Sequence, residues 1–146
     1  MGIRTTLYSV SREMALALIN DGDPGFEADA QLDLDKSAPV LGHLIGADPG
    51  RRGLYTSDCI EIADAALRGF LPEDVAMLLR RMKDVPVMER LASADWDAEI
   101  AGKIYPFETG TNPSDGAQYI QQFVQGFEDF VAGLVDQERG MITVEI

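Results

Sequence analysis

The feature that most constrains the fold is a long apolar stripe at helical spacing in the last third of the sequence. From Ser114 onward, apolar residues recur every three or four positions, which predicts one buried face of a helix about 20 residues long. These residues are Ile120, Phe123, Val124, Phe127, Phe130, Val131 and Leu134. An aromatic stripe of this kind is far more typical of a core than of a ligand pocket. We therefore expect this helix to organise the core.

The two ends of the chain have the composition of strands. Residues 3–10 are rich in Thr, Leu, Tyr and Val, and residues 141–146 partly alternate between apolar and polar side chains. Both patterns favour extended structure. Because helices are predicted between them, the two terminal strands are expected to pair in one small sheet.

Several shorter helices are predicted between these strands from apolar spacing and from residues that begin or end helices. Their expected positions are 11–20, 37–46, 58–69 and 72–83, with two further short pieces that start at Pro86 and Ser93. Ser37 is expected to cap the second of these helices. The expected fold class is α+β: a single domain over residues 1–146, with a small sheet that contains both terminal strands and packs against several helices, including the long aromatic-rich one.

Length and composition limit the class of protein. A chain of 146 residues suits one domain with a single core, which needs neither disulfides nor metals. Cys59 is the only cysteine, so no internal disulfide can form. The first residues contain no apolar stretch of signal-peptide length, and no run approaches the roughly 20 apolar residues of a membrane-spanning helix. We expect a cytoplasmic protein.

The formal net charge of −13 argues against nucleic acids and membranes as partners, because both surfaces are anionic. The charge is uneven, since a run of acids precedes Lys36 with no basic residue among them. These acids are Asp21, Asp23, Glu27, Asp29, Asp33 and Asp35. Such a run is usually a solvated face. It would also suit a basic protein partner or a bound cation.

The segment Leu32–Ser37 concentrates groups that carry chemistry. If it is extended, Asp33 and Asp35 face one side, about 7 Å apart by strand rise. That spacing is compatible with a cation site or an acid/base pair. The alternative is a structural cluster in which Lys36 neutralises an aspartate and the turn fixes the start of the next helix.

Three other residues have side chains that could take part in a site. His43 is the only histidine, and it is interpreted as an ordinary helix residue or, less readily, as a catalytic base. Cys59 is expected to be a small core residue. Tyr105 is expected to anchor a loop through a buried ring. No phosphate-binding loop, dinucleotide fingerprint, serine nucleophile motif or zinc-ligand spacing occurs, so no cofactor and no metal is expected.

Several motifs together resemble those of the YfbM-like family of small bacterial proteins, a domain of unknown function. They are the start Met1–Ile3, the block Leu32–Ser37, the helix opening Leu71–Val75, the triplet Ile104–Pro106 and the aromatic helix before a closing strand. Ala38 and Gly42 stand where the family typically has tryptophan and histidine. The resemblance implies an α+β fold and a bacterial cytosolic context, and it implies no reaction.

Two hypotheses of function follow. The first is a non-enzymatic protein-binding module, immunity-like or regulatory, whose acidic face engages a basic protein. The second is a hydrolase or a ligand- or metal-binding enzyme. Its site would combine Asp33, Asp35, Lys36, His43 and Tyr105. The sequence leaves the oligomeric state open.

Overall fold

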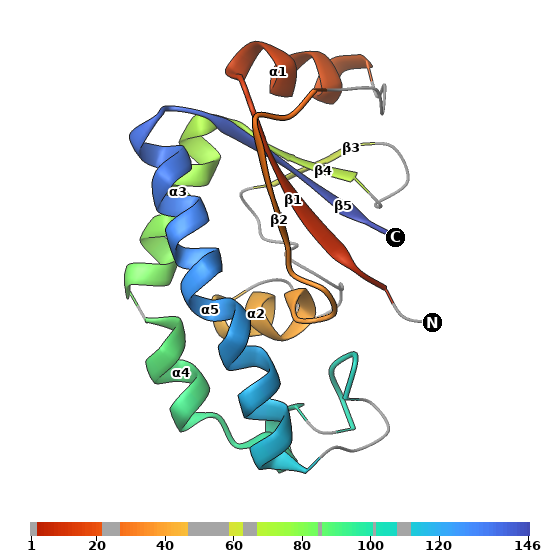
Figure 1. Ribbon diagram of the computed structural model, residues 1–146, viewed down its shortest axis with the longest axis vertical. Helices are drawn as coiled ribbons and strands as arrows, with labels where there is room; N and C mark the ends of the chain where they lie inside the picture. Colours follow the sequence, from red (N-terminus) through yellow and green to blue (C-terminus); the bar gives the residue numbers. More distant parts are fainter. Residues whose placement is uncertain are drawn as a thin grey trace.

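The computed structural model describes residues 3–21, 27–46, 59–62, 67–84, 86–100, 102–107 and 112–146. Within them, five strands form one antiparallel sheet in the order β2-β1-β5-β4-β3 (Figure 1). The strands are β1 (Thr5–Val10), β2 (Ala30–Asp33), β3 (Ile60–Ile62), β4 (Leu67–Phe70) and β5 (Gly140–Glu145). β1 and β5 pair along their whole length, so the predicted pairing of the two terminal strands is confirmed.

The helices lie on both faces of this sheet. They are α1 (Arg12–Asp21), α2 (Ala38–Leu44), α3 (Pro72–Asp84), α4 (Val87–Ser93), a π-helical turn (Trp96–Ile100) and α5 (Pro113–Asp136). α1 covers one face, where Leu18 packs with Ile142 in a small cluster. The other face carries the main core, in which Met141 of β5 packs with residues of α2, α3, α4 and α5. The α+β class expected from the sequence is confirmed.

The long C-terminal helix organises the main core, as predicted. α5 has 24 residues and begins after Asn112, whose Oδ1 accepts a hydrogen bond from the Ser114 amide at 2.9 Å. Five residues of the predicted stripe are buried: Ile120, Val124, Phe127, Val131 and Leu134. α5 packs closely on the π-helical turn because Gly116 has no side chain: a Cβ there would lie 2.8 Å from the Trp96 ring.

The prediction of a helix over 58–69 is wrong for those residues of the range that the structure describes. Residues 60–62 and 67–70 form β3 and β4, and Ile62 pairs with Leu67 across the two strands. Pairing of β4 with β5 overrides the local helical pattern, because strand preference depends mainly on neighbouring strands. Gly69, expected to end a helix, lies within β4. A Cβ there would meet the side chains of Ile19 and Ile62 at 2.9 Å, so the glycine lets α1 approach the sheet.

Two smaller expectations are also corrected. Ser37 precedes α2 but makes no side-chain cap; its hydroxyl donates to the Leu34 carbonyl at 2.7 Å. Ser93 ends α4 instead of starting a helical piece. The next piece follows Asp95, whose carboxylate accepts from the Ala98 amide at 3.2 Å. No helix among the described residues is both long and apolar enough to cross a membrane.

Candidate functional site

Asp33 and Asp35 form a turn where β2 ends. The Asp33 carboxylate accepts a hydrogen bond from the Asp35 amide at 2.7 Å. Asp35 has φ +48°, a left-handed conformation that aspartate tolerates better than most residues. The segment is therefore not extended through Asp35. The chain turns here, and Leu34 is buried in the main core.

Arg4 bridges both aspartates. Its guanidinium lies 3.0 Å from Asp33 Oδ2 through Nη2 and 3.1 Å from Asp35 Oδ1 through Nε. The arginine backbone is held at the end of the sheet by two hydrogen bonds with Ile146, of 2.7 and 2.9 Å. The cation that bridges the two carboxylates is thus Arg4, whereas the sequence had suggested Lys36.

Tyr119 of α5 completes this cluster, which we call the Asp35 junction and which consists of Arg4, Asp33, Asp35, Lys36 and Tyr119. The Tyr119 hydroxyl donates to Asp35 Oδ2 at 2.5 Å and accepts from the Lys36 amide at 3.1 Å. Burial and the hydrogen bond to Asp35 raise the pKa of Tyr119 to about 12. The junction therefore ties α5 to the segment between β2 and α2.

A row of aromatic rings continues from the junction into the core. The Tyr119 and Phe123 centroids lie 5.3 Å apart, Phe107 lies 6.3 Å from Tyr119, and Trp96 lies 5.4 Å from Phe107, all edge to face. Such aromatic pairs stabilise the folded state by more than the burial of their surface area alone. Sequence reasoning had not singled out Tyr119, and the one available signal was a phenol at the edge of the apolar stripe, which needs a hydrogen-bond partner when buried.

His43 lies on α2 and pairs with a different element. Its Nε2 is 3.7 Å from Glu99 Oε2 on the π-helical turn. Tyr105 lies half-buried after that turn and precedes Pro106 across a cis peptide bond. The structure thus gathers Asp33, Asp35 and Lys36 with Arg4 and Tyr119, while His43 contacts Glu99.

Cys59 is half-buried against the main core, directly before β3. It does not lie on a helix as expected, although its packing is that of a small core residue. Among the described residues, no three His, Cys, Asp or Glu side chains lie close enough together to hold a metal ion.

The run of acids before Lys36 is compensated by cations from distant parts of the chain. Asp33 and Asp35 contact Arg4, and Asp29 forms an ion pair with Arg139. Asp23 lies outside the described residues. The acidic stretch that looked unbalanced in sequence is therefore partly neutralised in space.

A buried ion pair that the sequence did not indicate lies on the core face of the sheet. Arg68 of β4 donates to Glu145 of β5 at 2.6 Å, and their side chains are only 4% and 12% exposed. Buried charges of this kind are tolerated when paired. The pair joins β4 to β5, the central strand of the sheet.

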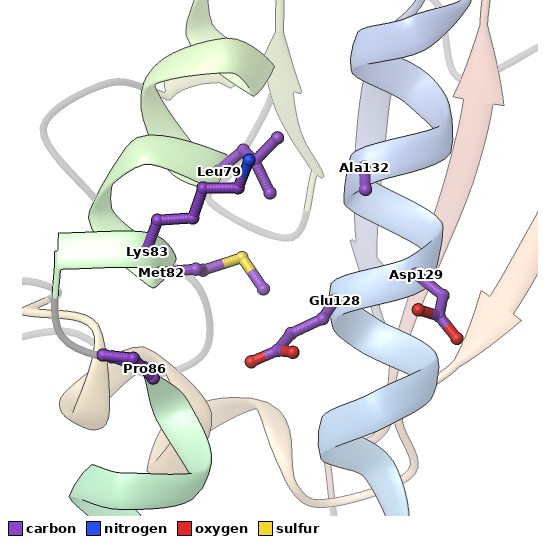
Figure 2. Close-up of a pocket in the computed structure, with 7 residues that line it drawn as sticks. All are labelled: Leu79, Met82, Lys83, Pro86, Glu128, Asp129 and Ala132. Carbon is purple, nitrogen blue, oxygen red and sulfur yellow. The ribbon is translucent and has the colours of Figure 1, made fainter.

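A groove of about 350 Å³ runs between α3 and α5 (Figure 2). Its lining consists of Leu79, Met82, Lys83, Pro86, Glu128, Asp129 and Ala132. In Figure 2 the Glu128 carboxylate points across the groove toward Met82 and Pro86, whereas Asp129 points away from it. Asp129 accepts a hydrogen bond from Gln125 at 2.8 Å. The sequence did not indicate this groove, because its residues come from α3, from α5 and from Pro86 before α4.

Glu128 differs from the acids of the Asp35 junction in having no partner among the described residues. It is half-buried, and in the described part of the chain no hydrogen bond or ion pair to its carboxylate is found. The Lys83 ammonium runs toward Leu79 in Figure 2, away from Glu128. A carboxylate that is partly removed from water without a counter-charge would gain from an external cation.

Comparison with known proteins gives a similarity to a solved structure. No protein-family model matches the chain, and no curated protein matches its sequence. Among solved structures, the chain is similar to the crystal structure of YfbM from Escherichia coli, described there as a protein of unknown function. The TM-score is 0.60 with 14% identity, over 97% of this chain and 98% of that one. The chain therefore has the fold of YfbM, as the motifs in its sequence implied.

Proposed function

We propose that this protein is a non-enzymatic binding module of the bacterial cytoplasm that recognises a basic protein partner. The observation that supports this most directly is the charge of α5. Its 24 residues include Asp115, Glu128, Asp129 and Asp136 and contain no Lys or Arg. A surface of one sign attracts groups of the other sign and speeds their association.

The relevant acids differ from those that the sequence made conspicuous. Asp29, Asp33 and Asp35 already contact Arg139 or Arg4, so they have less to offer a partner. Glu128, by contrast, is half-buried beside an apolar groove. A partner that brings a cation and an apolar group would satisfy both features.

The enzyme alternative, with a site around Asp33, Asp35, Lys36 and His43, has weaker support. Both oxygens of the Asp35 carboxylate contact internal donors, Arg4 and Tyr119. A general base must reach the proton that it removes. Asp35 would have to leave these partners before it acted on a substrate.

Capture from a bacterial lysate at low and high salt tests the proposal. The immobilised protein should retain basic proteins at low salt and lose them as salt screens the charges. The double variant Glu128→Gln, Asp129→Asn should capture much less. A matched control, Glu13→Gln with Glu27→Gln, removes the same number of charges from exposed positions elsewhere and should capture like wild type. Equal loss in both variants, or capture that salt does not affect, would contradict the proposal.

Thermal melts with Mg²⁺, Ca²⁺, Mn²⁺ and Zn²⁺ test the metal-binding alternative. A ligand that binds only the native state raises the melting temperature. We expect unchanged melts. A rise that Asp35→Asn abolishes would instead support a metal site at the Asp35 junction.

A further inference from the structure

We propose that the groove between α3 and α5 is the docking site for a basic amphipathic helix of a protein partner. An apolar side chain of that helix would insert between α3 and α5, and a Lys or Arg would lie against Glu128. This inference rests on the proposed function and specifies the surface and the chemistry of the partner.

The shape and lining of the groove suit side chains rather than a cofactor. Four of its lining residues are apolar: Leu79, Met82, Pro86 and Ala132. Its volume of about 350 Å³ is at the small end of the range of roughly 300–1,000 Å³ for ligand pockets. Two helices form its walls. Grooves of this kind bind the apolar face of an amphipathic helix.

Glu128 supplies the charge that selects a cation. Its carboxylate points across the apolar floor and has no partner among the described residues (Figure 2). Partial burial weakens screening by water, so an ion pair formed here gains more than one on an open surface. A basic residue beside the inserted apolar one would therefore be favoured over a neutral one.

The two sides of the groove carry opposite charges. Glu128 and Asp129 lie on the α5 side, and Lys83 lies on the α3 side. A basic helix should be attracted to α5 and repelled weakly by Lys83. Charge changes on the two sides should therefore have opposite effects on binding. A comparison with an equal charge change at a distant acid separates the groove from a nonspecific attraction to the net charge of −13.

The test uses two labelled synthetic helical peptides with Leu at positions i, i+3, i+4 and i+7. One carries Lys at the remaining positions and the other carries Glu. Binding is measured by fluorescence anisotropy near physiological salt. The wild-type protein should bind the Lys peptide and not the Glu peptide. Glu128→Gln, which keeps the side-chain shape, should weaken binding about fivefold.

Three further variants locate the binding surface. Ala132→Leu should fill part of the groove and weaken binding without any change of charge. Lys83→Gln should raise affinity slightly, because it removes the weak repulsion of the basic helix. Glu13→Gln, an exposed acid on α1 across the sheet, should bind like wild type. Melting curves for each variant establish that the fold is retained, and Glu128→Gln serves as the decisive variant if Ala132→Leu does not fold.

Several outcomes would overturn the inference. The groove is not the site if Glu128→Gln and Glu13→Gln weaken binding equally, or if the wild type does not bind the Lys peptide. Self-association in sedimentation that Ala132→Leu abolishes would assign the groove to a second copy of this chain. If lysate capture is sensitive to salt and to the double variant Glu128→Gln, Asp129→Asn but not to Ala132→Leu, the proposed function stands and the groove is not the docking site. If the wild type captures nothing, the proposed function itself fails.

Discussion

Asp35 and Glu128 are both partly buried carboxylates, yet their surroundings differ in kind. Asp35 contacts Arg4 and Tyr119 and joins the first strand, the turn after β2 and α5. Glu128 lies on an apolar groove with no partner in the described residues. The difference indicates that the acid most conspicuous in sequence maintains the fold, whereas an inconspicuous acid is available for binding. Variants at the two sites should therefore separate stability from recognition.

The largest effect is expected for Asp35→Ala. The change removes the acceptor of the Tyr119 hydroxyl and one partner of Arg4, and it leaves alanine in a left-handed conformation. We expect the free energy of unfolding to fall by about 3 kcal/mol. Urea denaturation measures this change. Asparagine keeps an acceptor and tolerates the left-handed conformation, so Asp35→Asn should lose less stability. An Asp35→Ala variant as stable as wild type would show that the junction does not maintain the fold.

Tyr119→Phe should have a smaller effect at the same junction. The ring keeps its edge-to-face contacts with Phe107 and Phe123, and only the hydroxyl bonds are lost. A loss of about 1.5 kcal/mol is expected in urea denaturation at pH 7. Combined with Asp35→Ala, its effect should be less than additive, because both changes remove the same hydrogen bond. Full additivity would contradict the assigned hydrogen bond.

Alkaline pH should weaken the junction through Tyr119. Its folded-state pKa of about 12 is higher than the value of 10.0 for an unperturbed tyrosine, so folding favours the protonated phenol. This contribution to stability is complete below pH 10 and is lost as pH rises from 10 to 12. Spectroscopic titration of phenolate together with urea denaturation at pH 9 to 11 measures it. Tyr119→Phe should lose less stability than wild type over this range, and equal losses would contradict the prediction.

The smallest effect on stability is expected at the groove. Glu128→Gln removes a charge that has no partner in the part of the chain that the structure describes, so the free energy of unfolding should change by no more than about 0.5 kcal/mol. The same variant should weaken binding of the Lys peptide. A large loss of stability would mean that Glu128 has a structural role, and the contrast with Asp35 would then fail.

Parts of the fold with local signals were predictable. The spacing of Val75 and Leu78 predicted α3, and the spacing of Ile120 and Phe127 predicted α5. Residues on one face of a helix recur every three or four positions, and so again after seven. The hairpin of β3 and β4 was not predictable in this way. β4 depends on pairing with β5, which is distant in the chain, and β3 pairs in turn with β4.

The candidate site was predictable only in part. The turn at Asp33 and Asp35 is local, and the sequence indicated a cluster there. Its partners come from elsewhere, since Tyr119 is 84 residues from Asp35 and Arg4 is 29 from Asp33. No spacing rule connects residues so far apart.

The sequence by itself determined the terminal strands, the helices with clear periodicity, the net negative charge and the family-like motifs. The tertiary structure alone decided which acids are neutralised and which remain available. The physical reason is that periodicity reflects contacts within one turn of helix or one strand, whereas ion pairs and grooves form between elements that the folded chain brings together. Glu128 faces a groove because α3 packs beside α5, and Asp35 is satisfied because β1 and α5 both reach the end of β2.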